Sequence, residues 1–428
     1  MFSKEKPWSV STNTVWRGML TLAVGSGTGR LIAICAIPLL TRIYTPSDYG
    51  VLAVFASFVN ILVPAFTLRY EIALPLPRQD GLAINILLLC SAIMCAFGII
   101  ATVALFLFSE SLLPLLAADE LLPFWWIIVP GAMGVATYEM LGLWATRRRA
   151  YKVIARTQLT QSLVGESLKI LLGLLSIKPL GLIAGQVATQ SGGIGYYLSS
   201  FVEDLRNLSR RLSVKRILFV AGYYKDFPIY RFPSQLLLVF SVQAPLLFCA
   251  SSYGSNATGH LGLAIMSLGL PISLLGRSMS RAFYAEIAAL GRNRLEEIRA
   301  ISLSVQKRMF VIGAPAVAIL FSLGPDIFRV AFGKDWYDAG LYSSYLSVFL
   351  LFQLTSAPLV QVFNIFETQR AFFLINLARL LGLIVLFFLT SLLEIGIRHF
   401  VMAYSAYMTL YYLFVSFLVF RYLSPSRA

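Results

Sequence analysis

The sequence is dominated by apolar stretches of about 20 residues, which recur roughly every 35 residues along the chain. A stretch of that length is what an α-helix needs to cross a hydrocarbon core about 30 Å thick. Hydrophobic residues make up 58% of the chain and charged residues only 13%. A soluble domain carries roughly 25% charged residues, so a soluble fold of this composition could not cover its own surface. The sequence therefore predicts an all-α polytopic membrane protein.

About 12 transmembrane helices are predicted. Their approximate limits are 18–40, 47–68, 83–108, 122–145, 156–177, 179–201, 232–252, 258–280, 307–325, 340–363, 371–393 and 396–420. The fifth and sixth stretches are the least regular, because they carry charged, amide and glycine residues. The first stretch is longer than the apolar core of a signal peptide and contains Arg30, so we expect an uncleaved helix.

Basic residues alternate between the connections. If the N-terminus is cytoplasmic, most of the 35 Lys and Arg residues fall in connections on the inside, as the positive-inside rule requires. The outside connections carry only Arg42, Lys178, Arg329, Lys334 and Arg398. We therefore expect a multi-pass protein with both termini in the cytoplasm.

The longest inside segment, 202–231, divides the chain into two six-helix lobes, 1–201 and 232–428. This segment places apolar residues at helical spacing with basic residues between them. It should lie on the anionic cytoplasmic leaflet, and we interpret it mainly as a basic linker that tethers the lobes. The turns that begin at Tyr44 and Tyr253 have similar sequences. This similarity suggests two parallel repeats with a transport path between them.

Charged residues inside the predicted spans are costly, at about 2.5–3.5 kcal/mol or more for each charge near the bilayer centre. They are Arg30, Glu139, Glu166, Lys169 and Arg379. One interpretation is pairing, of Glu166 with Lys169 and of Arg30 or Arg379 with Glu139. The other is a cationic cavity, in which Arg30, Lys169 and Arg379 bind an anionic cargo.

Further charges stand at the predicted cytoplasmic mouth of the cavity. Arg281 and Arg69 would add to its cationic character. Arg69 and Glu71 are two residues apart, so they either bridge a gate or anchor the topology. Glu139 and Glu166 are candidate sites for a coupling ion, with H+ and Na+ as the candidates.

Several function classes find no support in the sequence. No paired carboxylates in a loop, P-loop, nucleophile elbow or Cys/His site is present, so we expect a protein that is not an enzyme and needs no cofactor or metal. The net charge of +15 is scattered in short clusters rather than gathered in one stripe, so we expect no nucleic-acid partner.

Four motifs stand in order along the chain. They are Leu40-Thr-Arg-Ile-Tyr-Thr-Pro-Ser-Asp-Tyr-Gly, Thr67-Leu-Arg-Tyr-Glu-Ile-Ala-Leu-Pro-Leu-Pro, Tyr224-Lys-Asp-Phe-Pro-Ile-Tyr, and a stretch from Phe332-Gly-Lys-Asp-Trp through Ala339-Gly-Leu-Tyr to Pro358-Leu-Val-Gln-Val-Phe-Asn. Together they resemble the polysaccharide transporter (PST) family, which includes O-antigen and other oligosaccharide-lipid flippases. This family belongs to the MATE-like multidrug/oligosaccharidyl-lipid/polysaccharide exporter superfamily.

The resemblance implies two six-helix lobes around an alternating-access cavity in the bacterial inner membrane. The implied cargo is a lipid-linked oligosaccharide of the undecaprenyl diphosphate type, moved from the cytoplasmic to the periplasmic face for lipopolysaccharide or related surface polysaccharides. A polysaccharide polymerase complex is a candidate partner. Amides in the spans could bind sugar or simply join helices; they are Gln161, Gln186, Gln190, Gln243, Asn364 and Asn376.

Two other functions compete with flipping. A small-molecule exporter of the same fold would share the helices but not the motifs. A non-transporting scaffold for envelope assembly would have no use for charges inside its spans.

Overall fold

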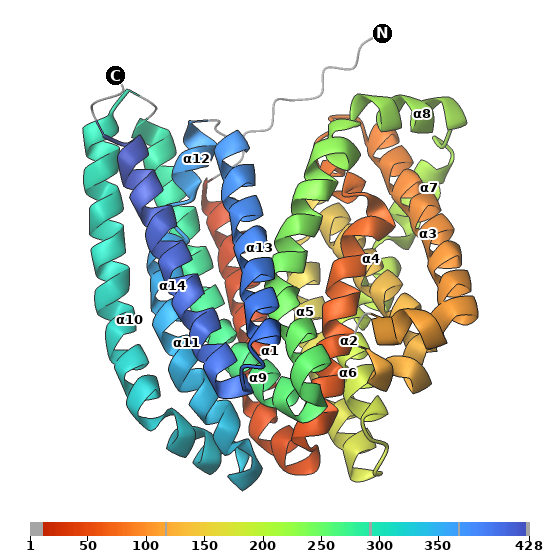
Figure 1. Cartoon of the computed structure of the whole chain (residues 1–428). Helices are drawn as coiled ribbons and strands as arrows, with labels where there is room; N and C mark the ends of the chain where they lie inside the picture. Colours follow the sequence, from red (N-terminus) through yellow and green to blue (C-terminus); the bar gives the residue numbers. More distant parts are fainter. Residues whose placement is uncertain (1–11, 116–117, 291–292, 367–368, 425–428) are drawn as a thin grey trace. The chain divides into compact units, whose positions relative to one another are not determined.

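A computed structural model describes residues 12–115, 118–290, 293–366 and 369–424, and within these residues all regular secondary structure is helical (Figure 1). The α-helices in chain order are α1 (Thr12–Ile43), α2 (Pro46–Thr67), α3 (Asp80–Leu115), α4 (Trp125–Arg147), α5 (Tyr151–Leu174), α6 (Leu180–Ser191), α7 (Ile194–Ser209), α8 (Val214–Tyr223), α9 (Phe232–Leu290), α10 (Leu295–Phe332), α11 (Tyr337–Ser356), α12 (Gln361–Ile365), α13 (Gln369–Leu392) and α14 (Ile397–Tyr422). Short 3-10 or π turns are η1 (Tyr70–Ala73), η2 (Asp119–Phe124), η3 (Phe227–Arg231) and η4 (Lys334–Trp336).

Eight helical segments of the described residues are long and apolar enough to cross a bilayer. They are Pro46–Thr67, Asp80–Pro114, Asp119–Arg147, Phe227–Gly269, Leu295–Phe332, Lys334–Phe363, Phe373–Leu392 and Ile397–Tyr422. The predicted class, an all-α polytopic membrane protein, is confirmed, whereas the count of twelve spans stays a prediction.

Glycines divide two of the long helical stretches. Gly254 interrupts α9 with φ 79° and ψ 176°, at the connection predicted between the seventh and eighth spans. The predicted sixth span, 179–201, is two helices, because α6 ends before Gly192 and α7 starts after Gly193. A Cβ atom on Gly193 would come within 2.8 Å of Thr157 and Tyr138, so glycine lets this turn approach α5 and α4 closely.

The helices gather into two compact units. The first consists of Met1–Ile37, Leu62–Leu107 and Phe124–Phe232, and the second of Pro38–Ile61, Phe108–Pro123 and Pro233–Ala428. The units therefore interleave along the first third of the chain, where α1, α2 and α3 each contribute to both. The lobes 1–201 and 232–428, joined by a linker at 202–231, stay a prediction.

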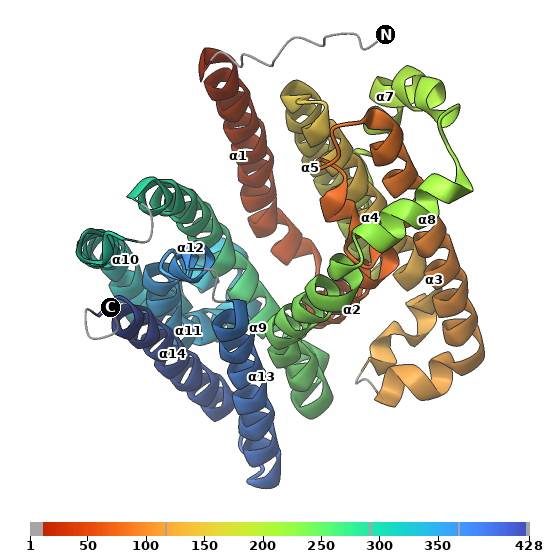
Figure 2. The ribbon, with the colours of Figure 1, turned by 90° about the horizontal axis from the view of Figure 1, so that it is seen from above.

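In the first unit, α5 packs on α6, and α4 packs on both α6 and α7. The core of this unit surrounds Trp144 and Tyr197, which are almost completely buried. In the second unit, α11 packs between α10 and α14, and α13 packs on α14. Figure 2 shows α10 nearly end-on and α13 and α14 obliquely.

The two similar turns, which begin at Tyr44 and Tyr253, contact each other inside the second unit. The hydroxyls of Ser47 and Ser255 are 2.8 Å apart. A Cβ atom on Gly50 would overlap the carbonyl oxygen of Ser255, and one on Gly259 would overlap that of Pro46, so these helices touch backbone to backbone. Trp336 Nε1 donates a hydrogen bond to the Thr41 carbonyl at 2.9 Å. The first and fourth sequence motifs therefore hold this unit together.

Candidate functional site

Arg379, on α13, is a buried cation without a carboxylate partner among the described residues. It is only 8% exposed, and none of the ion pairs formed by the described residues includes it. Its Nε atom has no hydrogen-bond partner there. Keeping an unneutralised guanidinium inside a membrane protein is expensive, and residues of this kind usually mark a transport pathway.

Tyrosines of α14 surround this guanidinium. Its central carbon lies 5.7 Å from the centre of the Tyr411 ring, in a cation–π arrangement. Tyr404 is hydrogen-bonded to it. The Tyr407 hydroxyl donates to the backbone carbonyl of Arg379 at 2.9 Å, and Gly382 leaves room for the Tyr407 ring. The guanidinium is therefore held in place by neutral groups, which position it without cancelling its charge.

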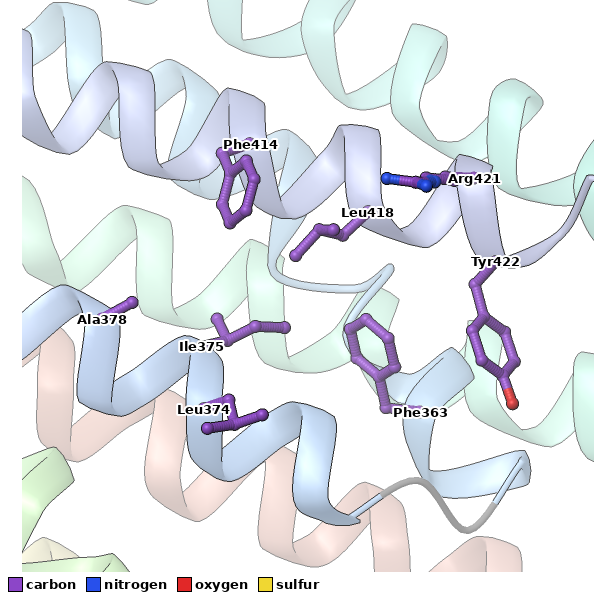
Figure 3. Close-up of a pocket in the computed structure, with 8 residues that line it drawn as sticks. All are labelled: Phe363, Leu374, Ile375, Ala378, Phe414, Leu418, Arg421 and Tyr422. Carbon is purple, nitrogen blue, oxygen red and sulfur yellow. The ribbon is translucent and has the colours of Figure 1, made fainter.

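An apolar groove of about 470 Å³ adjoins this site between α13 and α14. Figure 3 shows aliphatic and aromatic side chains along it and Arg421 and Tyr422 at one end of α14. Ala378, which lines the groove, directly precedes Arg379, and Phe414 is three residues from Tyr411 on the same helix face. The volume lies within the range of about 300–1,000 Å³ for small-molecule sites, and the lining suits a hydrocarbon chain.

The second predicted cation, Lys169, is neutralised. Its Nζ atom lies 2.9 Å from Glu166 Oε1, and both side chains are almost completely buried on α5. This is the pairing alternative, and it follows from the spacing of three residues on a helix. A Cβ atom on Gly185 of α6 would overlap the Lys169 side chain, so that glycine makes room for the lysine.

Amide groups near this pair lack partners among the described residues. Gln158 Oε1, Gln161 Nε2 and Gln190 Oε1 are buried without a hydrogen bond. Buried amides are ordinarily satisfied, so three exceptions in α5 and α6 indicate groups that could receive hydroxyls of a ligand. Gln161 and Gln190 are among the amides predicted from the sequence to bind sugar or join helices, whereas Gln158 is not.

Arg69, Glu71 and Glu139 form one cluster in the first unit. Arg69 Nη1 lies 3.0 Å from Glu71 Oε1 and 3.8 Å from Glu139 Oε2. Glu71 is buried, while the Glu139 side chain is 48% exposed. Leu68 and Arg69 both adopt left-handed backbone conformations, with φ 47° and 63°, which non-glycine residues rarely do. Two carboxylates thus share one guanidinium at a strained turn.

A second ionic network joins the N-terminal end of α3 to the C-terminal end of α4. Arg148 binds Asp204 through two hydrogen bonds of 2.6 and 2.7 Å and Asp80 through one of 2.9 Å. Arg147 also binds Asp80, at 2.7 Å. Burial alone would lower the pKa of Arg148, but the hydrogen bonds to Asp204 and Asp80 outweigh it and raise this pKa above its ordinary value. Charge counting along the sequence had predicted the arginines as topology signals and gave no indication of their partners.

Two further predicted cations are Arg30 and Arg281, and Asn364 is a further predicted amide. Arg30 is half-buried on α1 and interacts with other residues of the chain. The side chains of Arg281 and Asn364 lie outside the described residues. Sequence reasoning thus named all four cations, and Arg379 is the one whose charge the structure shows buried and without a carboxylate among the described residues.

Comparison with known proteins gives both a family and a relative. The sequence model of the family described as "Polysaccharide biosynthesis protein" matches residues 39–340. The succinoglycan biosynthesis transport protein ExoT of Rhizobium meliloti (strain 1021) is 24% identical over 344 residues, which cover 77% of this chain and 64% of ExoT. The chain therefore spans slightly less than two thirds of the length of that relative.

Solved structures with the same fold are transporters. The lipid II flippase MurJ in an inward closed conformation aligns with a TM-score of 0.69 at 15% identity, covering 94% of this chain and 91% of MurJ. A MATE in complex with MaL6 aligns with a TM-score of 0.61 at 14% identity, covering 95% of this chain and 96% of the other. Identities this low establish the fold alone, which is the fold expected from the sequence motifs.

Proposed function

The chain belongs to the polysaccharide biosynthesis protein family, and on that premise we propose that it is a flippase for a lipid-linked oligosaccharide. The cargo would be a polyprenyl diphosphate of the undecaprenyl type, carrying a glycan destined for O-antigen or a related surface polysaccharide. It would move by alternating access from the cytoplasmic to the periplasmic face of the bacterial inner membrane. In this function the protein is a transporter and not an enzyme.

The buried, carboxylate-free charge of Arg379 carries the proposal. A polyprenyl diphosphate presents phosphate oxygens, which a planar guanidinium binds through two parallel hydrogen bonds. The neutral tyrosines around Arg379 keep its charge available for such an anion. The guanidinium would meet the diphosphate when α13 and α14 open during the cycle.

Two further features, one in each unit, suit the other parts of such a cargo. The apolar groove beside Ala378 could receive part of its hydrocarbon tail. The unpartnered amides Gln158, Gln161 and Gln190 could bind its sugar hydroxyls. An amphiphile with an anionic head would use all three chemistries, whereas a small cationic drug would be repelled by the guanidinium.

The energy source would act through the Arg69 cluster. Because two carboxylates share one guanidinium, binding of H+ or Na+ at Glu139 would leave Arg69 paired with Glu71 alone. Such a change could release or close a gate at this end of α2 and α4. Lys169 supplies its own cation to Glu166, so that pair is a weaker candidate for ion coupling.

A small-molecule exporter is the second candidate function, because MATE structures share the fold. The test is complementation in a bacterial strain that lacks its own oligosaccharide-lipid flippase but still assembles the lipid-linked oligosaccharide. A flippase restores surface glycan without changing drug tolerance. Drug tolerance without surface glycan, at normal protein abundance in the membrane, would favour the exporter.

The orientation can be measured independently of the cargo. In a variant without native cysteines, Ser111→Cys should react with an impermeant thiol reagent added to spheroplasts, whereas Ser209→Cys should not. Both positions are exposed, so burial does not protect either one. The reverse pattern would contradict cytoplasmic termini and the twelve-span topology that predicts them.

A further inference from the structure

The segment predicted as a linker contains a short helix, α8, that lies crosswise to α3 at the N-terminal end of that helix (Figure 1). Large apolar side chains cover its outer surface. The exposed fractions are 71% for Val214, 68% for Leu218, 57% for Phe219 and 69% for Tyr223. Four such side chains on ten residues form an apolar surface of the kind that marks an interaction site.

The inner side of α8 is fixed to the first unit. Val220 is 1% exposed and belongs to the core around Trp144. Tyr70, in η1, donates a hydrogen bond from its hydroxyl to the Ala221 carbonyl at 3.0 Å. The apolar surface is therefore held outward by the fold, and it is not a loose stretch that could turn inward.

Asn85 holds the turn that leads into α8. This side chain is completely buried in α3. Its Oδ1 atom accepts a hydrogen bond from the Ser213 backbone N–H at 3.0 Å, and its Nδ2 atom donates to the Arg211 carbonyl at 3.2 Å. One side chain thus satisfies backbone groups on both sides of the turn and sets the direction in which α8 leaves it.

Exposed cations lie within α8 and on both sides of it in the chain. Within the segment 202–231 the basic residues are Arg206, Arg210, Arg211, Lys215, Arg216, Lys225 and Arg231. The acidic residues are Glu203, Asp204 and Asp226, and Asp204 is bound to Arg148. An exposed apolar helix bordered by cations matches a bilayer surface that contains anionic lipid, with the apolar side chains below the phosphates and the cations among them.

We propose that α8 is a preformed interfacial helix that docks on the anionic phospholipid of the bilayer surface. A crosswise helix at the end of a membrane-spanning helix lies in the plane of that surface. Because Tyr70 adjoins both Arg69 and Glu71 in the chain, docking of α8 would also steady the strained turn that carries the Arg69 cluster. This docking does not depend on the identity of the cargo.

The experiment places an environment-sensitive fluorophore on Leu218→Cys, in protein whose exposed native cysteines Cys35 and Cys95 are replaced by alanine. The full chain is reconstituted in nanodiscs of phosphatidylcholine alone or mixed with phosphatidylglycerol. The matched control carries the same fluorophore on Ser209→Cys, an exposed polar position in the same segment. Emission wavelength, quenching by aqueous iodide and quenching by spin-labelled lipid are measured.

Docking predicts blue-shifted emission at position 218, several-fold weaker iodide quenching than at position 209, and strong quenching by the labelled lipid. The shift should grow with phosphatidylglycerol, and Lys215→Gln with Lys225→Gln, which removes two of the seven cations, should weaken that dependence while leaving the protein folded. A fluorophore at 218 that stays accessible to iodide in both lipid mixtures would overturn the proposal and leave the surface to a protein partner. Emission at position 218 that does not change with phosphatidylglycerol would overturn the proposed preference for anionic lipid.

Discussion

Replacement of Arg379 separates a functional charge from a structural one. In Arg379→Gln the side chain keeps hydrogen-bonding groups but loses its charge, its fork of donors and its cation–π contact with Tyr411. Because no carboxylate among the described residues pairs with Arg379, its removal strands no opposite charge. We therefore expect transport to fall steeply while the protein stays folded.

The magnitudes follow from the surroundings of the guanidinium. Loss of hydrogen bonds between a charged donor and phosphate costs about 1.5–3 kcal/mol. Since 1.4 kcal/mol is tenfold, transport should fall roughly 10- to 150-fold. For stability, the lost cation–π contact, about 0.5–2 kcal/mol, is offset by removal of a buried charge that costs at least about 2.5–3.5 kcal/mol. The free energy of unfolding should therefore stay equal or rise.

The assay is surface-glycan display in the flippase-deficient strain, with membrane abundance quantified and the melting temperature of purified protein measured. Arg379→Lys keeps the charge and should retain part of the activity. The matched control is Arg398→Gln, because Arg398 forms an exposed ion pair with Asp338 worth about 0–1 kcal/mol. That control should transport normally.

Two results would refute the reasoning. Normal glycan display by Arg379→Gln at normal abundance would show that the guanidinium does not handle the anion. A marked fall in melting temperature would show instead that Arg379 is a structural residue whose tyrosine contacts outweigh its burial cost.

Three further predictions test the other clusters. Lys169→Ala should destabilise the protein by about 3–5 kcal/mol, because it leaves the buried Glu166 carboxylate without a partner. In a thermal melt, the double change Lys169→Met with Glu166→Gln should recover most of that loss. No recovery would mean that loss of the ion pair is not the cause of the destabilisation. Gly50→Leu should lower folded abundance in the membrane because its side chain would meet backbone, whereas Gly222→Ala, which has open space around it, should not; equal abundance would disprove the close contact. Glu139→Gln should change the free energy of unfolding by no more than about 1 kcal/mol. It should reduce transport and make the transport rate less dependent on an imposed H+ or Na+ gradient. A transport rate that depends on the gradient as before would exclude Glu139 as the coupling site.

The sequence was sufficient for the fold class because membrane spans depend on local composition. Twenty consecutive apolar residues leave few alternatives to a helix across the bilayer, so the long helices fall where hydropathy predicted them. The break at Gly254 was also predictable, because a glycine beside a turn sequence marks a chain reversal. The division of 179–201 at Gly192 and Gly193 was not predicted, since glycines inside apolar stretches also occur in continuous membrane helices.

Partners of charged residues were predictable only where the two residues lie close together in the chain. Glu166 and Lys169 are three residues apart and had to share a face. Arg148 binds Asp80, which is 68 residues away in the chain, and Asp204, which is 56 residues away. No local sequence pattern joins these residues. Positive-inside counting treats every loop arginine alike and cannot tell a paired residue from a free one.

The same limit explains why Arg379 could be singled out as the proposed anion site only once the fold was known. Position along the sequence alone favours Arg30, because it lies nearer the middle of its predicted span, 18–40, than Arg379 does in 371–393. Depth in the bilayer sets what a charge costs, but the neighbours decide whether that charge is available to a ligand. Lys169 has a carboxylate at 2.9 Å, whereas Arg379 has only phenols and ring faces among the described residues. Tyrosine is apolar enough to pack around a guanidinium and too weak an acid to neutralise it, so a tyrosine-lined arginine keeps its full charge for an anion that arrives from outside the helix bundle.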